Sequence, residues 1–185
     1  MINTPNKITV LRIFLIPALV ISLIYGYKNI ALGIFCFSAI TDALDGFIAR
    51  FFGKITKLGS FIDPLADKLL IVTSFLFLSF FGDLRIPFWI SVLVVSRDVI
   101  ISLGWGLLYL LTDCFSGDKI VIPPSYLGKL TTILQMLTIF LYLLSIKWAY
   151  WIALLMILIA ISSTIDYLIK GSKMFNHAKE IKRKA

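Results

Sequence analysis

The stretch that decides the fold is Thr41–Lys68, TDALDGFIARFFGKITKLGSFIDPLADK. Long apolar runs flank it on both sides, yet it holds four of the chain's ten acidic residues: Asp42, Asp45, Asp63 and Asp67. Ionisable groups at bilayer depth are costly, and they normally face a bundle interior or an aqueous cavity. The stretch therefore predicts a functional site between two membrane helices.

The composition is that of an integral membrane protein. Of 185 residues, 59% are hydrophobic and 15% are charged, and the mean hydropathy is +0.97. Several apolar runs reach the roughly 20 residues that a helix needs to cross a hydrocarbon core. We therefore expect an all-α integral membrane protein, in which residues 1–185 form a single domain of six transmembrane helices around a cytosol-facing polar cavity. The expected spans are Ile8–Tyr25, Asn29–Arg50, Gly59–Phe80, Pro87–Thr112, Tyr126–Ser145 and Trp148–Lys170.

The distribution of basic residues predicts the orientation. An even number of spans puts both termini on one side, and 13 of the 18 Lys and Arg residues fall on that side against three on the other. The positive-inside rule then places both termini in the cytoplasm, in an inner (cytoplasmic) membrane. The N-terminus is expected to be a retained first helix. Residues 171–185 are expected to be a basic cytoplasmic tail with a disordered end; the alternative is that this tail lies on anionic lipid.

Composition also narrows the chemistry. The net charge of +8 lies mostly in loops and the tail, which argues against nucleic-acid binding. The two cysteines, Cys36 and Cys114, form neither a disulfide framework nor a metal-ligand spacing. His177 is the only histidine and lies in the tail, so any chemistry in the core must come from carboxylates.

The four aspartates are spaced to share one pocket. Asp42 and Asp45 are three residues apart, Asp63 and Asp67 are four apart, and each pair therefore lies on one helix face. Four carboxylates in one pocket require cations, and oxygen ligands select hard ions, so we expect two divalent cations, Mg²⁺ or Mn²⁺. Such a pair of ions serves in-line phosphoryl displacement. The alternatives are ion pairs with Arg50, Lys54 or Lys68, or a cation carrier that uses the aspartates as its ion path.

The same residues resemble the signature of a known family. Asp42-x-x-Asp45-Gly46-x-x-Ala49-Arg50, then Gly59, Asp63 and Asp67 at the family's spacing, is similar at all eight positions to the CDP-alcohol phosphotransferases. The resemblance implies a metal-dependent transfer of a substituted phosphoryl group from a CDP-linked donor to an alcohol, with release of CMP, commonly in a homodimer. It implies that all four aspartates bind metal and that Asp67 is the general base. It further implies CDP-binding roles for Asp42, Gly46, Ala49, Arg50, Gly59 and Ser60.

The acceptor must be read from charges outside this signature. Arg97 and Lys129, with Lys68 and Arg12, are candidates for a basic pocket that binds a phosphate on the acceptor. The stretch around Leu127-Gly128-Lys129 resembles bacterial phosphatidylglycerophosphate synthases, which implies CDP-diacylglycerol and sn-glycerol 3-phosphate as substrates. The stretch around Arg97-Asp98 also resembles cardiolipin synthases of the same family, whose acceptor is phosphatidylglycerol. A third interpretation is that Arg97 only forms an ion pair with Asp98 or Asp166.

Polar residues elsewhere in the spans predict contacts between helices. We expect Gln135, Thr131 and Thr132 to form hydrogen bonds with neighbouring helices, and Asp166 to pair with a nearby cation.

Overall fold

The chain folds into helices throughout the part that the structure describes. The computed structural model describes the backbone of residues 4–52, 59–81, 84–115 and 126–184, and the side chains of residues 11–42, 66–81, 84–104 and 126–170. Over these residues it contains six helices and no strand. The helices are α1 (Thr4–Ile24), α2 (Lys28–Phe52), α3 (Gly59–Phe80), α4 (Phe88–Phe115), α5 (Tyr126–Leu143) and α6 (Ala149–Lys184).

The expected spans coincide with these helices, with one clear exception. The bounds of α3 are those expected, and the starts of the other helices differ by at most a few residues. The exception is α6, which continues to Lys184, so the disordered end expected for the tail is wrong. The tail, GSKMFNHAKEIKRKA, is rich in Lys and also contains Ala and Arg, all of which favour helix, and it contains no proline.

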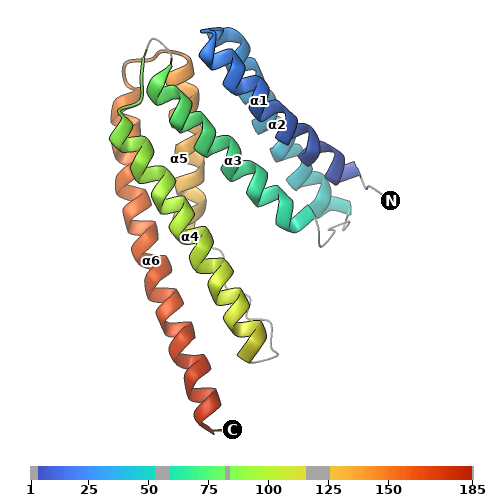
Figure 1. Cartoon of the computed structure of the whole chain (residues 1–185), viewed down its shortest axis with the longest axis vertical. Helices are drawn as coiled ribbons and strands as arrows, with labels where there is room; N and C mark the ends of the chain where they lie inside the picture. The colour runs from blue at the N-terminus through green and yellow to red at the C-terminus, as the bar shows by residue number, and fades with distance from the viewer. Residues whose placement is uncertain (1–3, 53–58, 82–83, 116–125, 185) are drawn as a thin grey trace.

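The helices run up and down, so that successive connections alternate between the two ends of the bundle. In Figure 1 the α1–α2, α3–α4 and α5–α6 connections gather at the upper end, and both chain termini lie away from it. Helix α1 packs against α2 and α3, α3 packs against α4, and α6 packs against α4 and α5. Helix α5 also contacts α2 and α3, which joins the two halves of the bundle.

The core is apolar and lies where these helices meet. Phe75 of α3, Ile90 of α4, Ile139 of α5 and Met156 of α6 are fully buried. Ser91 adds a polar link between α4 and α3, because its hydroxyl donates to the carbonyl oxygen of Phe75 over 2.9 Å. Such hydrogen bonds between helices contribute well under about 2 kcal/mol each in a membrane, so packing dominates.

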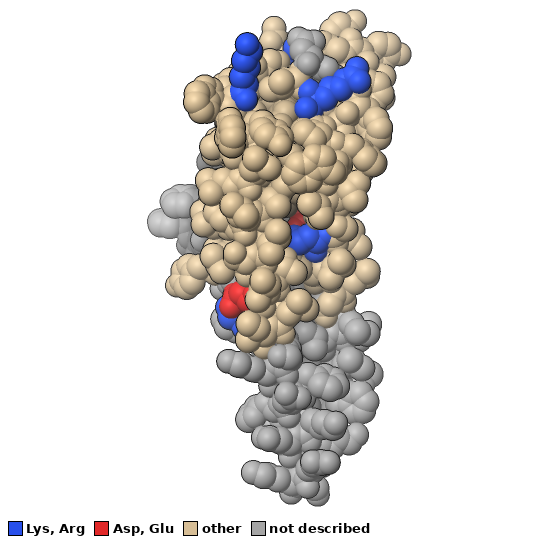
Figure 2. All heavy atoms as spheres, turned by 90° about the vertical axis from the view of Figure 1, so that its left-hand side faces the viewer, with Lys and Arg blue, Asp and Glu red and all other residues tan. Residues whose placement is uncertain are grey.

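Large apolar side chains also cover the outside of the bundle. Phe14, Leu103, Leu158 and Leu168 are each more than 60% exposed. Figure 2 shows a mostly uncharged face, with a few Lys and Arg side chains at its upper end and two places lower down where a cation lies beside a carboxylate. A soluble surface would rarely leave so much apolar area open, whereas lipid tails would cover it.

Only part of the six-span layout is visible as continuous apolar helix. Among the described residues, Tyr126–Leu143 and Ala149–Lys170 are long and apolar enough to cross a membrane, with mean hydropathies of 1.3 and 2.3. A shorter apolar segment covers Leu11–Ile24.

Candidate functional site

Arg12 joins two of the four signature aspartates. One guanidinium nitrogen of Arg12, Nη1, lies 2.8 Å from Oδ1 of Asp42 and also contacts Oδ1 of Asp67. The three residues come from α1, α2 and α3, and the first three helices therefore converge at this point. The two carboxylates are separated by 25 residues in the sequence, and they meet because α1 packs on both helices that carry them.

The burial of the three side chains is unequal. The side chain of Arg12 is 1% exposed, whereas those of Asp42 and Asp67 are 33% and 25% exposed. The guanidinium thus approaches the carboxylates from the interior of the bundle, and the carboxylates retain open surface. A buried cation with paired carboxylates satisfies the charge balance that an apolar interior requires.

The rest of the signature lies in the same two helices. Asp45, Gly46, Ala49 and Arg50 belong to α2, and Gly59, Ser60 and Asp63 belong to α3. Their side chains lie outside the described residues, so the expected group of four carboxylates is described for Asp42 and Asp67 only. Both of these side chains are carboxylates that lie beside a positive charge. Carboxylate oxygens are the ligands that Mg²⁺ and Mn²⁺ prefer, so the two side chains fit such an ion.

Lys68 follows Asp67 in α3 but contacts a different helix. Its ammonium group donates to the hydroxyl of Ser102 in α4, and that hydroxyl donates to the carbonyl oxygen of Asp98 over 2.6 Å. The ammonium group of Lys68 therefore contacts Ser102 and not the aspartates with which an ion pair was suggested. The cation that pairs with Asp42 and Asp67 is Arg12.

Arg97 lies in a second polar cluster, at the contact of α4 with α5 and α6. Its Nη1 donates to Oδ1 of Asp98 over 2.6 Å, its Nη2 to Ser163 over 2.9 Å and its Nε to Thr164 over 3.4 Å. Gln135 of α5 completes the cluster by donating to the other oxygen of Asp98. The ion pair of Arg97, which the sequence allowed as an alternative with Asp98 or Asp166, is observed with Asp98. The expected contact of Gln135 with a neighbouring helix is confirmed.

The other polar residues of α5 and α6 make local contacts. Thr131 and Thr132 donate to the carbonyl oxygens of Leu127 and Gly128 in their own helix, over 2.8 and 3.2 Å, and not to a neighbouring helix as expected. Asp166 pairs with Lys170 one turn further along α6, at 2.7 Å, which confirms the expected cation. Lys129 is exposed near the start of α5.

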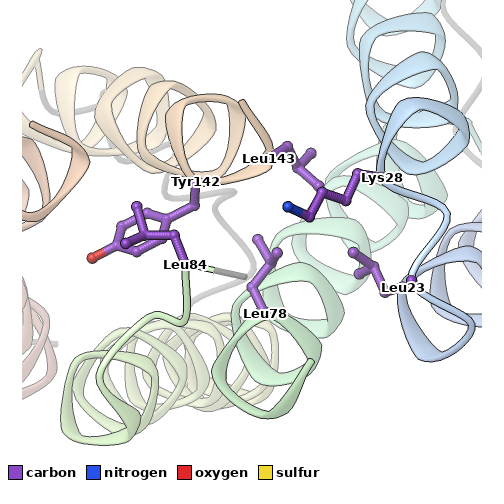
Figure 3. A pocket seen from close by; sticks show the side chains of 7 residues that line it. Leu23, Lys28, Leu78, Leu84, Tyr142 and Leu143 are labelled. Atoms are coloured by element: carbon purple, nitrogen blue, oxygen red, sulfur yellow. The ribbon is translucent and has the colours of Figure 1, made fainter. Parts of the chain in front are cut away.

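A small apolar pocket lies at the opposite end of the bundle from Arg12. Figure 3 shows Leu23, Leu78, Leu84, Tyr142 and Leu143 around it, with Lys28 beside them. The ammonium group of Lys28 donates to the hydroxyl of Ser145 over 3.2 Å. Because none of the signature residues lines this pocket, it is separate from the acidic site.

Two sets of partners were not expected from the sequence. The first is the contact of Arg12 with Asp42 and Asp67. The second is the pair of hydroxyls, of Ser163 and Thr164, that accept hydrogen bonds from Arg97. The sequence did offer a signal for Arg12, because it is a charged residue inside an apolar span and such a residue normally has a partner. Serine and threonine are ordinary in membrane helices, so nothing in the sequence marked Ser163 or Thr164.

Comparison with known proteins agrees with the signature. The family model for CDP-alcohol phosphatidyltransferase matches residues 2–163. The chain is 34% identical over 180 residues to a "probable phosphatidylglycerophosphate synthase" of Mycobacterium tuberculosis, covering 91% of this chain and 81% of that protein. It is 30% identical over 184 residues to the CDP-diacylglycerol–glycerol-3-phosphate 3-phosphatidyltransferase of Aquifex aeolicus, covering 93% and 97%.

A relative with another activity is also similar. The human CMP-forming cardiolipin synthase is 35% identical over 148 residues, which cover 73% of this chain and 48% of that protein. The family match spans most of the chain and includes every signature residue in α2 and α3. The chain belongs to the CDP-alcohol phosphatidyltransferase family.

Proposed function

We propose that this protein is a phosphatidyltransferase of phospholipid biosynthesis. It transfers the phosphatidyl group from CDP-diacylglycerol to sn-glycerol 3-phosphate, giving phosphatidylglycerophosphate and CMP. The observation that carries the proposal is the convergence of Asp42 and Asp67, from two different helices, on one positively charged group. The names of the Aquifex aeolicus and Mycobacterium tuberculosis relatives support the same donor and acceptor.

The acidic site supplies the transfer chemistry in this proposal. Asp42, Asp45, Asp63 and Asp67 hold two divalent cations, Mg²⁺ or Mn²⁺. Bound there, the cations would neutralise the diphosphate of the donor and stabilise the leaving CMP. Asp67 accepts the proton of the attacking hydroxyl. The acceptor oxygen bonds to the phosphorus that carries diacylglycerol, the bond from that phosphorus to CMP breaks, and the proton remains on the carboxyl of Asp67.

The nucleotide and the acceptor are bound by neighbouring residues. In the proposal the cytidine diphosphate contacts Asp42. It also contacts residues whose small side chains make space for it or that bind its phosphates, namely Gly46, Ala49, Arg50, Gly59 and Ser60. The phosphate of the acceptor is bound by Arg97 and Lys129, with Lys68. Arg12, the fourth candidate, is buried against Asp42 and Asp67 instead. Arg97 supports this role because Asp98, Ser163 and Thr164 hold its guanidinium in place, and a fixed guanidinium binds phosphate at a lower entropic cost.

The protein is proposed to be a homodimer in the inner membrane, with six spans and both termini in the cytoplasm. The exposed apolar side chains of the bundle support insertion into a membrane, and the excess of Lys and Arg on the side of the termini supports the orientation. The homodimer rests on the resemblance to the family. Reporter fusions at the C-terminus test the orientation: a reporter active only in the cytoplasm should be active there. Activity of a reporter that requires export would contradict the proposal.

The experiment that tests the activity is a product assay on the purified protein. Radiolabelled CDP-diacylglycerol is offered with Mg²⁺ or Mn²⁺ and, in parallel, with glycerol 3-phosphate, phosphatidylglycerol, inositol phosphate or serine. We expect CMP and phosphatidylglycerophosphate from glycerol 3-phosphate. Cardiolipin from phosphatidylglycerol would instead assign the activity of the human relative. No CMP with any acceptor would overturn the enzyme proposal and leave cation transport as the alternative.

A further inference from the structure

Arg12 has a property that binding an acceptor phosphate does not explain. Its side chain is 1% exposed and is the largest of the fully buried side chains among the described residues. A single nitrogen, Nη1, contacts carboxylate oxygens of both Asp42 and Asp67. The guanidinium is therefore placed where two signature carboxylates meet, with its charge directed at them.

This position makes Arg12 an electrostatic equivalent of a bound cation. Two carboxylates that meet in a partly apolar site repel each other, and a positive charge between them removes that cost. A divalent cation held by the same carboxylates would do the same. Because both carboxylates are partly exposed while Arg12 is buried, a cation can reach them from the open side as the arginine holds them from the inner side.

We propose that Arg12 is the internal counter-ion of the acidic site and opposes the binding of divalent cations to Asp42 and Asp67. The inference rests on the proposed function, since it assumes that these carboxylates bind metal. Arg12 holds α1, α2 and α3 together when no metal is bound. It also weakens the affinity of the site for metal, because two positive charges a few ångströms apart repel each other strongly in a partly buried site.

The test is Mn²⁺ affinity, measured on the full-length protein in detergent after removal of metal with EDTA. Electron paramagnetic resonance of free Mn²⁺ gives the Kd without any need for turnover. Arg12→Gln removes the charge and should lower the Kd about tenfold. Arg12→Lys keeps the charge and should stay near the wild-type Kd. Arg85→Gln, at an exposed site near the start of α4, changes the net charge equally and should leave the Kd unchanged.

Thermal unfolding separates the counter-ion role from simple packing. Arg12→Gln should unfold at a lower temperature than wild type in EDTA, and Mn²⁺ should raise its Tm by more than it raises that of wild type. A variant that folds only when Mn²⁺ is present would support the same conclusion. An equal loss of Tm with and without Mn²⁺, or a variant that saturating Mn²⁺ does not rescue, would overturn it.

The outcomes also separate this inference from the proposed function. If wild type binds Mn²⁺ and Arg12→Gln binds it no more tightly, the counter-ion inference is wrong and the metal site stands. If wild type does not bind Mn²⁺ at all, the metal-dependent function fails and the inference fails with it.

Discussion

Gln135 of α5 donates its side-chain amide to Asp98 of α4, with 3.0 Å between Nε2 and Oδ2, and both side chains are buried. The second oxygen of Asp98 accepts from Arg97, which also reaches Ser163 on α6. The pair of Arg97 and Asp98 thus connects α4 to both α5 and α6. The cluster fixes the guanidinium of Arg97, which is proposed to bind the phosphate of the acceptor. Each member of the cluster can be substituted separately.

Asp98→Ala should destabilise the protein strongly, because it leaves the cation of Arg97 in a mostly buried position without its carboxylate. Removal of one partner of a buried ion pair costs about 3 kcal/mol or more. Unfolding in detergent with increasing SDS would measure this loss. Asp98→Asn keeps a hydrogen-bonding oxygen and should lose less. The double variant Arg97→Met/Asp98→Leu removes both charges and should be more stable than Asp98→Ala; an equal or larger loss would contradict the ion-pair explanation.

Arg97→Ala should raise the KM for glycerol 3-phosphate about tenfold, because a hydrogen bond to a charged group contributes about 1.5 to 3 kcal/mol. The KM for CDP-diacylglycerol should change little, which distinguishes acceptor binding from general disruption. Steady-state kinetics with each substrate varied in turn would provide both values. An unchanged acceptor KM in a less stable protein would restrict Arg97 to its ion pair with Asp98.

Asp67→Asn should abolish turnover while CDP binding is partly retained, because the amide cannot accept the proton of the attacking hydroxyl. CMP release measures turnover, and calorimetric titration with CDP measures binding. Asp166→Asn is the matched control: Asp166 pairs with Lys170 within α6, so its loss should leave turnover unchanged. Normal turnover in Asp67→Asn would remove Asp67 as the general base.

Gly128→Ala should destabilise the contact between α5 and α6. A Cβ atom at Gly128 would lie 2.5 Å from the hydroxyl oxygen of Tyr167, so the tyrosine must move. Overpacking of this kind costs about 1 to 3 kcal/mol, toward the low end here because the clash is with the far end of a side chain. Thermal unfolding should show the loss, and in a Tyr167→Phe background the same glycine change should cost less. An equal cost in both backgrounds would rule out this clash.

The helices of this protein were predictable from the sequence because apolar runs and their breakers are local signals. Gly59–Phe80 was expected as a span and is α3, and the ion pair of Arg97 with its sequence neighbour Asp98 was one of the alternatives that the sequence offered. The helical tail was not anticipated, because its charges suggested a solvated, disordered end. Its Lys, Ala and Glu residues nevertheless favour the helix that continues to Lys184.

The contacts of the acidic site were less predictable because they join distant parts of the chain. Helical spacing indicates that Asp42 and Asp45 share a face, but it does not identify the cation that faces them. Lys68, Arg50 and Lys54 are nearer in sequence, whereas the observed partner of Asp42 is Arg12, 30 residues away on α1. The choice among such partners depends on how α1 packs against α2 and α3.

The position of Arg12 also bears on how the protein is made. Arg12 lies on α1, which leaves the ribosome before α2 and α3, the helices that carry its carboxylate partners. If α1 spans the membrane as proposed, its arginine costs about 2.5 to 3.5 kcal/mol at the centre of a helix that enters the membrane alone. We expect α1 to remain near the insertion machinery until Asp42 and Asp67 have been synthesised, so that the three helices leave it as one unit.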